Sequence, residues 1–236
     1  IQERIEAVTE VNVINTKSAV VDYKKYGNVF HKTDTHWTGL GAYAGYKEII
    51  NSMVEKNIIV KDNTEVQFVE VKFKGEFSKM LGSNGILPDE KTLTTKIIGQ
   101  KAVKEYNVPK VTEFDQIRIK SDLIEPIYYF RNESKKDNPV ILIFGDSYFG
   151  SWNVNELFAE NFYETYFVWT NNKNIGTTGI NKEIINSIKP DIVIFERTER
   201  FINVLGKDFK EEGAKWILSI YKYRAYFIKA MLTISL

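Results

Sequence analysis

The chain of 236 residues contains no cysteine and only two histidines. The absence of cysteine excludes a disulfide framework, a thiolate metal site and a cysteine nucleophile. The charge is nearly balanced, with 32 basic and 31 acidic side chains, so the sequence gives no electrostatic reason to expect a nucleic-acid partner. No spacing of histidines or carboxylates predicts a metal site, and no glycine-rich loop predicts a phosphate site. We therefore expect no cofactor.

The chain also lacks a long uncharged hydrophobic run. No such stretch approaches the roughly 20 residues that a membrane-spanning helix needs. The C-terminal stretch AKWILSIYKYRAYFIKAMLTISL is apolar but is interrupted by Lys222, Arg224 and Lys229, so we expect a terminal amphipathic helix packed on the core or on a membrane surface. The opening stretch IQERIEAVTE lacks a methionine and has the pattern of an amphipathic helix. We expect that the sequence begins inside a longer protein and that a targeting segment is missing.

From residue 139 onward, short apolar runs alternate with segments of helical periodicity. The apolar runs are continuous, as expected of strands buried on both faces of a sheet. This order, with short connections, is typical of a parallel α/β sheet flanked by helices. The predicted strands are PVILIF (139–144), ETYFVWT (164–170) and DIVIFE (191–196), and the predicted helices are NVNELFAENF (153–162) and INKEIINSIK (180–189).

The N-terminal part predicts the same α/β class. VNVI (11–14) has the pattern of a strand, TKSAVVDYKKY (16–26) that of a helix, and Thr38 is a suitable N-cap for a helix over 39–56.

The middle of the chain has alternating apolar and polar segments separated by turn-rich stretches, which predicts a β-rich insertion over 58–138. We therefore expect one α/β domain over 1–206 that contains this insertion. A C-terminal amphipathic tail over 207–236 follows it.

A Gly145-Asp146-Ser147 turn follows the first of these predicted C-terminal strands and precedes a helix. In an open parallel sheet, ligands bind beyond the carboxyl ends of the strands, where the Ser147 hydroxyl would lie. The glycine permits a tight turn, and the helix N-terminus offers backbone N–H groups, that of Ser147 first, for an oxyanion. The same residues are also consistent with a simple strand-to-helix turn capped by serine.

A nucleophilic serine needs a base, and only His31 and His36 can supply an imidazole. Asp34 and His36 are two residues apart, so in an extended segment both side chains point to the same side. An aspartate so placed can accept the imidazole Nδ1–H and fix the tautomer. His31 lacks such a partner and is interpreted as a surface or helix-end histidine. Although DTHWT alone is consistent with a polar helix-entry loop, its combination with a strand-end Ser147 favours a triad.

Three further residues near the expected site are candidates for substrate contact. Asn171 and Asn172 follow the strand ETYFVWT at the same sheet edge, so either carboxamide could be a second oxyanion donor. An asparagine-rich turn is an equally good interpretation. Trp37 is a candidate sugar-stacking wall beside the base, although a tryptophan that precedes a helix more often packs into the core.

Charged residues close the last predicted strand in the same crevice. Arg197 and Arg200 alternate there with Glu196 and Glu199. A salt-bridged structural cluster is the first interpretation of these four side chains. Contact of the arginines with an acidic or hydroxylated sugar is the second.

Three segments, TDTHWTGLGA (33–42), ILIFGDSYF (141–149) and PDIVIFERTER (190–200), resemble in this order the alginate O-acetyltransferase AlgX/AlgJ family and the pattern-related DHHW proteins. The resemblance covers about half of the chain, over 11–56 and 139–204. It implies an SGNH-hydrolase-like fold in permuted order, because the Asp/His block precedes the Ser block. It also implies a triad of Ser147 as nucleophile, His36 as base and Asp34 as the group that orients it.

The function implied by this resemblance is O-acetylation of an exopolysaccharide outside the cytoplasm. The acetyl groups would come from a membrane-bound O-acyltransferase partner. Two alternatives use the same residues or the same fold: a carbohydrate acetylesterase with the same triad, and a non-catalytic polysaccharide-binding component of an assembly. The intact triad argues against the non-catalytic alternative.

Overall fold

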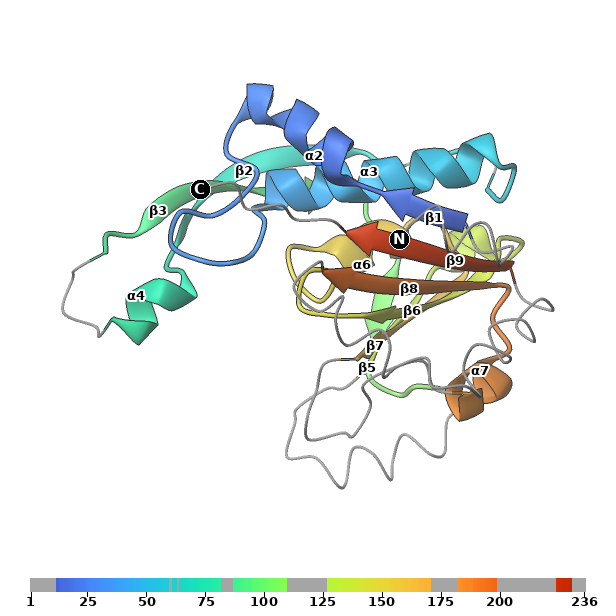
Figure 1. Cartoon of the computed structure of the whole chain (residues 1–236). Helices are drawn as coiled ribbons and strands as arrows, with labels where there is room; N and C mark the ends of the chain where they lie inside the picture. Colours follow the sequence, from blue (N-terminus) through green and yellow to red (C-terminus); the bar gives the residue numbers. More distant parts are fainter. Residues whose placement is uncertain are drawn as a thin grey trace.

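The computed structural model describes residues 12–59, 61–62, 64–81, 87–109, 127–170, 182–198 and 224–230. Its centre is a seven-stranded sheet in the order β1-β9-β8-β6-β7-β5-β4 (Figure 1). The strands are β1 (Asn12–Asn15), β4 (Val103–Glu105), β5 (Ile127–Arg131), β6 (Val140–Gly145), β7 (Glu164–Trp169), β8 (Ile192–Thr198) and β9 (Arg224–Ala230).

Strands β1, β9, β8, β6 and β7 run parallel to one another. Strand β5 is antiparallel to β7, and β4 is antiparallel to β5. The predicted α/β class with a parallel sheet and flanking helices is confirmed, and an antiparallel pair extends one edge of the sheet.

Helices cover both faces of the sheet, as the alternation of buried residues along β6 requires. Ile141 and Ile143 point to one face, where they join a core cluster with residues of α3 (Gly39–Glu55) and α6 (Val154–Ala159). Leu142 and Phe144 point to the opposite face, where they pack with α7 (Lys182–Ile188). All four side chains are fully buried, and each such burial contributes about 1.5–3 kcal/mol.

The region before α3 also follows the sequence prediction. Helix α2 (Lys17–Asp22) and the 3-10 helix η1 (Tyr23–Tyr26) come after β1. Thr38 caps α3, and its hydroxyl accepts the Gly41 N–H at 3.3 Å. The cap fixes the point at which the Asp34–His36 loop ends and the helix begins.

The C-terminal helix prediction is wrong for Arg224–Ala230. These residues form β9, which lies between β1 and β8 and pairs in parallel with both (Figure 1). The segment contains Tyr226, Phe227 and Ile228, which are aromatic or β-branched and favour strands. Two neighbouring strands supply backbone partners that a local helical pattern cannot reveal. Residues 207–223 and 231–236, and the helix predicted at the N-terminus, lie outside the described residues.

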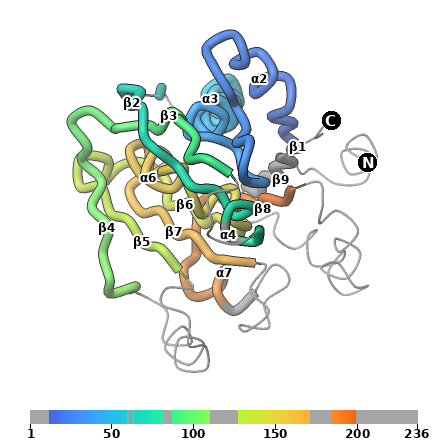
Figure 2. The backbone as a smooth tube through the Cα atoms, turned by 90° about the vertical axis from the view of Figure 1, so that its left-hand side faces the viewer, coloured from blue at the N-terminus to red at the C-terminus, as the bar shows by residue number. Residues whose placement is uncertain are grey.

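The described parts of 58–138 are rich in strands, and these belong to two sheets. Strands β4 and β5 join the central sheet, whereas β2 (Val66–Phe73) and β3 (Glu90–Ile97) form a separate antiparallel ribbon. A short helix, α4 (Glu76–Met80), follows β2. Figure 2 shows β3 beside α3, and Gly39 lies so close to Leu93 and Thr94 that a Cβ atom would meet their backbone at 2.5–2.6 Å.

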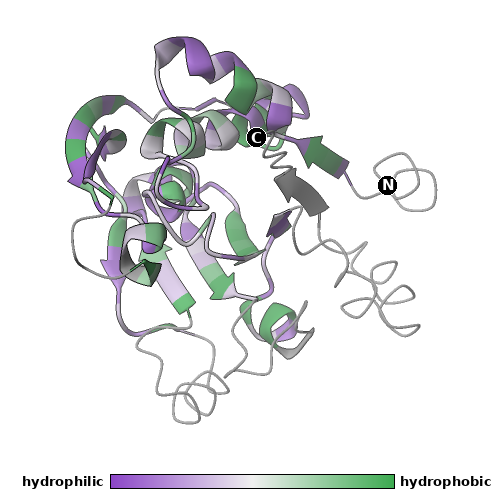
Figure 3. Cartoon of the chain, turned by 60° about the vertical axis from the view of Figure 1, so that its left-hand side comes forward, coloured by the Kyte–Doolittle hydropathy of each residue, from purple (hydrophilic) through white to green (hydrophobic). Residues whose placement is uncertain are grey.

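The hydropathy of the β2–β3 ribbon differs from that of the central strands. Hydrophobic and hydrophilic residues are mixed along β2 and β3 (Figure 3), and most of β2 is exposed. Because most of β2 is exposed and β3 contacts α3, the ribbon is a partly solvated layer beside that helix. None of the helices in the described ranges combines the length and the hydrophobicity that a bilayer-spanning segment requires.

Candidate active site

The turn after β6, which carries Ser147, is held by close packing at Gly145 and by hydrogen bonds to Asp146. A Cβ atom on Gly145 would lie 2.7 Å from the Phe167 ring, so the close packing of the strand end requires glycine. The fully buried Asp146 carboxylate accepts the Tyr148 N–H at 2.9 Å and the Thr198 hydroxyl at 2.8 Å. Asp146 therefore organises the turn, and the partly exposed Ser147 is left facing the site.

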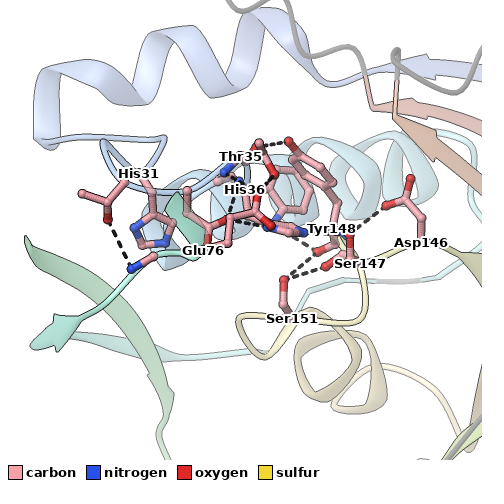
Figure 4. Close-up of polar contacts among 12 residues, drawn as sticks. His31, Thr35, His36, Glu76, Asp146, Ser147, Tyr148 and Ser151 are labelled. Carbon is pink, nitrogen blue, oxygen red and sulfur yellow. Dashed lines mark hydrogen bonds and ion pairs between the residues drawn. The ribbon is translucent and has the colours of Figure 1, made fainter. Parts of the chain in front are cut away.

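Asp34, His36 and Ser147 form a continuous hydrogen-bonded chain, of which His36 and Ser147 are labelled in Figure 4. His36 Nε2 lies 2.7 Å from Ser147 Oγ, and His36 Nδ1 lies 2.6 Å from Asp34 Oδ1. Because an ionised carboxylate can only accept, Nδ1 donates to Asp34 and Nε2 accepts from the serine hydroxyl. The structure thus brings together the three residues that the sequence proposed as a triad, from segments 111 positions apart.

Asp34 remains ionised because several N–H groups face it. Burial raises its pKa, but hydrogen bonds from the His36 ring and from the backbone N–H groups of Glu76 and His36 outweigh burial, so the pKa lies below its ordinary value. The Glu76 N–H reaches Asp34 Oδ2 at 2.9 Å, and the His36 N–H reaches Oδ1 at 3.0 Å. An anionic Asp34 can stabilise the imidazolium that forms when His36 takes a proton.

Two glutamates from the 66–97 segment hold the loop that carries Asp34 and His36. Glu76 Oε1 accepts the Thr35 N–H at 3.3 Å and the Thr35 hydroxyl at 2.5 Å. Glu90 accepts the Lys32 N–H at 3.0 Å and the Thr33 hydroxyl at 2.7 Å. No local sequence pattern predicts these contacts, since the partners are 41 to 58 residues apart.

The same segment also contacts the loop that follows Ser147. The Asn153 carboxamide donates to the Thr95 carbonyl at 2.7 Å. Asn153 and the preceding Trp152 have left-handed backbone, with φ of 61° and 58°. Such conformations cost about 1–3 kcal/mol in residues other than glycine and persist where surrounding contacts hold them. The β2–β3 ribbon and α4 therefore support both halves of the site.

Trp37 and Tyr148 join the two halves directly. The Trp37 indole N–H donates to the Tyr148 carbonyl at 3.1 Å, and the Tyr148 hydroxyl donates to the Thr35 carbonyl. The interpretation of Trp37 as a sugar-stacking wall is corrected, because its side chain is only 1% exposed and belongs to the core. Its indole N–H finds its partner inside the protein, and this partner ties the base loop to the serine turn.

His31 is corrected as well, since it is not a surface residue. Its side chain is fully buried, with Nδ1 3.1 Å from Glu90 Oε1 and the ring stacked on Phe73 at 4.0 Å. Burial lowers the pKa of His31 and outweighs the opposing effect of Glu90 and Asp34. His31 is therefore a neutral part of the packing between the base loop and the β2–β3 ribbon.

Of the remaining candidates for substrate contact, only Arg197 lies among the described residues. Asn171, Asn172 and Arg200 lie outside the described residues. Arg197 is buried, donates to the Thr170 hydroxyl and lies over the Phe195 ring at 4.6 Å. This position favours the structural interpretation of Arg197 over contact with a sugar.

Asp34, His36 and Glu76 are the one group among the described residues whose side chains could share a metal ion, with ligand atoms within 4.8 Å of one another. Each of these ligands already has a hydrogen-bond partner in the site. A metal would have to displace Asp34 or Ser147 from the imidazole. The arrangement therefore fits proton transfer better than metal binding.

No protein-family model matches the chain, and no curated protein matches it significantly. Several solved structures do. A DHHW family protein from Eubacterium siraeum is 13% identical, with a TM-score of 0.48 over 92% of this chain and 63% of that one. The O-acetyltransferase domain of Pseudomonas putida AlgJ is 12% identical, with a TM-score of 0.35 over 92% and 58%. Bacillus cereus PatB1 with a sulfonyl adduct is 17% identical, with a TM-score of 0.48 over 74% and 64%.

The chain thus spans less than two thirds of the length of each of these three structures. The structural neighbours include a DHHW family protein and AlgJ, which represent both groups that the sequence motifs resemble.

Proposed function

We propose that the chain is an SGNH-type O-acetyltransferase that moves an acetyl group through an acetyl-Ser147 intermediate onto hydroxyls of an exopolysaccharide. The observation that supports it most is the Asp34–His36–Ser147 chain of hydrogen bonds, 2.6 and 2.7 Å long, at the carboxyl end of β6. A serine in contact with a base, and a base oriented by a third group, is the arrangement that activates a hydroxyl for acyl transfer.

In the first half-reaction, Ser147 Oγ attacks the acetyl carbonyl of the donor while His36 Nε2 takes the hydroxyl proton. The backbone N–H of Ser147, at the turn, is the candidate donor to the oxyanion of the tetrahedral intermediate. When this intermediate collapses, the donor's leaving oxygen takes the proton from His36, and acetyl-Ser147 remains. Asp34 stays ionised throughout and stabilises the imidazolium.

In the second half-reaction, a sugar hydroxyl gives its proton to His36 and attacks the acetyl carbonyl of acetyl-Ser147. The new intermediate expels Ser147 Oγ, which takes the proton back from His36. The products are an O-acetylated sugar and the original triad, so no cofactor is required.

The identities of the acyl group and the acceptor come from the resemblance of the sequence motifs to the AlgX/AlgJ family. On this proposal, the protein acts outside the cytoplasm, and a membrane-bound O-acyltransferase supplies its acetyl donor. The domain boundary predicted at 206 is moved, because β9 (Arg224–Ala230) lies inside the central sheet; the catalytic domain of this proposal therefore includes β9, and it also includes β4 and β5 from the predicted insertion over 58–138.

Hydrolysis is the second candidate function, because the triad alone does not choose the acceptor. The His36 side chain is 20% exposed, so both water and a sugar hydroxyl can reach the base. An acetylesterase would use the same acetyl-Ser147 intermediate and differ only in its second half-reaction.

The partition of the acyl-enzyme between water and sugar distinguishes the two enzymes. Water is present at about 55 M, and a well-oriented hydroxyl can reach an effective molarity of about 10⁵ M or more. We expect slow hydrolysis of a chromogenic acetyl ester alone. Addition of β-linked or uronic-acid oligosaccharides should accelerate chromophore release and produce an acetylated sugar, detected by mass spectrometry.

The matched control is Ser147→Ala, which should release no chromophore with or without acceptor. If no acceptor in the panel gains an acetyl group while water hydrolyses the acyl-enzyme rapidly, the esterase replaces the transferase.

A further inference from the structure

Two carboxyl groups from neighbouring strands meet under the turn that carries Ser147. Glu196, on β8, is fully buried, and its Oε2 accepts the backbone N–H of Asp146 at 2.8 Å. Asp146 is also fully buried, and its Oδ2 accepts the N–H and the hydroxyl of Thr198 at 3.2 and 2.8 Å. Residues of β8 therefore hydrogen-bond to both the backbone and the side chain of Asp146, the residue before the nucleophile.

The two buried carboxyl groups differ in their hydrogen bonds. Both carboxylate oxygens of Asp146 accept N–H or O–H donors. Glu196 Oε1, by contrast, has no hydrogen-bond partner among the described residues. An ionised carboxylate with an unpartnered buried oxygen would be costly, whereas a protonated carboxyl group avoids that charge.

The charges around Glu196 support the same protonation state. Burial raises its pKa well above the ordinary value, and the nearby negative charge of Asp146 raises it further. The Asp146 N–H and the positive charge of Arg197, the neighbouring residue on β8, act in the opposite direction and are outweighed. Glu196 therefore favours its neutral, protonated form.

We propose that Glu196 is a positioning residue for Ser147: by accepting the Asp146 N–H, it fixes the turn so that the serine hydroxyl stays within reach of His36. The inference rests on the proposed function, in which Ser147 is the nucleophile. Displacement of a reacting group by about 1 Å can cost about 10²-fold in rate. A neutral carboxyl group also keeps a second negative charge away from the oxyanion that forms at this turn.

Two substitutions distinguish the role of Glu196 as a hydrogen-bond acceptor for the Asp146 N–H from its ability to ionise. Glu196→Gln keeps a side-chain carbonyl that can accept the Asp146 N–H but cannot ionise, and Glu196→Leu removes the acceptor. We expect Glu196→Gln to retain kcat within about threefold at pH 7, and Glu196→Leu to lower kcat about 10²-fold with little change in KM.

The pH profile gives a readout that a merely structural role would not move. Burial and the charge of Asp146 raise the pKa of Glu196 well above its ordinary value; as the pH rises through that raised pKa, ionisation adds a charge beside Asp146, so wild-type kcat should decline. The decline should be absent in Glu196→Gln. An equal alkaline decline in both proteins contradicts the proposal.

Glu160 provides the matched control. It is also a buried carboxylate that accepts backbone N–H groups, those of Lys101 at 3.0 Å and Ala102 at 2.9 Å, beside strand β4 rather than β6. Glu160→Leu should lower the melting temperature and leave kcat per folded molecule unchanged. If Glu160→Leu lowers kcat as much as Glu196→Leu does, the effect is general destabilisation and the proposal fails.

A milder variant serves if Glu196→Leu does not fold. Thr198→Val removes only the hydroxyl that donates to Asp146 Oδ2, and it should lower kcat about tenfold without changing KM. Unchanged kcat in a folded Thr198→Val protein, together with the wild-type alkaline decline in Glu196→Gln, overturns the proposal.

All variants are compared by the rate at which a sulfonyl fluoride labels Ser147, as well as by ester turnover. Labelling of wild-type protein at Ser147 establishes the nucleophile independently of Glu196. If wild-type Ser147 is not labelled, the proposed function fails. If it is labelled and Glu196→Leu reacts at the wild-type rate, only the positioning role of Glu196 is rejected.

Discussion

The two histidines lie within one short loop, and each ring faces a carboxylate, but only one ring contacts a nucleophile. In both pairs the carboxylate faces Nδ1, at 2.6 Å between Asp34 and His36 and at 3.1 Å between Glu90 and His31. The difference lies at the other ring nitrogen. His36 Nε2 contacts Ser147 Oγ, whereas His31 Nε2 is buried and has no partner among the described residues.

The surroundings of the two rings explain this difference. The His31 ring lies against Phe73 and Trp152, at centroid distances of 4.0 and 4.8 Å, and its side chain is fully buried. The His36 side chain is 20% exposed and lies at the end of β6, where a substrate can approach. A carboxylate at Nδ1 therefore does not by itself define a catalytic histidine, because the group at Nε2 decides what the ring can do.

Replacing each histidine should give the largest contrast. His36→Ala should lower kcat/KM for an acetyl ester by about 10⁴-fold or more, since the base and the nucleophile of a triad act as a unit. His31→Ala should cost little activity at pH 7.5, because its ring does not reach Ser147. Steady-state kinetics on folded protein measures both effects, and equal losses would mean that the wrong imidazole has been paired with the serine.

Replacing the carboxylates Asp34 and Glu90 should give the same kind of contrast in kcat, with a smaller difference between the two variants than for the histidines. Asp34→Asn should lower kcat by about 10⁴-fold, because the amide no longer fixes the His36 tautomer or stabilises the imidazolium. Glu90→Gln is the matched control at the other pair. It should leave the kcat of folded protein within about tenfold of wild type, since Glu90 acts on the loop rather than on His36. A larger loss in Glu90→Gln than in Asp34→Asn would contradict the assignment.

The contrast between the histidines follows from features that the sequence shows only in part. The apolar runs around 139–196 and the Gly145-Asp146-Ser147 turn are local signals, so the parallel strands and the position of Ser147 could be predicted from them. Asp34 and His36 are two residues apart, so this pairing was also visible locally. Convergence of the two segments depends on contacts between distant residues, such as the Trp37 indole N–H that donates to the Tyr148 carbonyl, which no local pattern reveals.

Long-range contacts account for what the sequence did not reveal. Glu90 is 59 residues from His31, and no local pattern links them. Strand β9 depends on partners on both sides, and its aromatic and basic residues have a helical pattern when taken alone. The charged pattern at the end of β8 suggested salt bridges, whereas Glu196 contacts the Asp146 backbone in a fully buried position.

The smallest expected effect is on stability and concerns His31. Its pKa in the folded protein is below the ordinary value of 6.5, because burial disfavours the imidazolium. As the pH falls below 6.5, the unfolded chain therefore binds a proton that the folded protein resists, and the free energy of unfolding decreases. The pKa values of Asp34 and Glu90 are lowered, so their contributions are lost only at more acidic pH.

Thermal melts from pH 7.5 to pH 5 test this expectation. Wild-type protein should lose stability over this range, and His31→Gln should lose less, because glutamine keeps a donor for Glu90 but does not titrate. An identical decline in both proteins would show that His31 is not the group responsible.

Covalent labelling with a serine-directed sulfonyl fluoride, followed by peptide mass spectrometry, tests the central claim most directly. The account predicts a single adduct on Ser147 in wild-type protein, much slower labelling in His36→Ala, and near wild-type labelling in His31→Ala. Ser147→Ala should remain unlabelled while its circular dichroism spectrum stays that of the folded protein. An adduct at another residue that persists in Ser147→Ala, or labelling of Ser147 that is as fast in His36→Ala as in wild type, would contradict it.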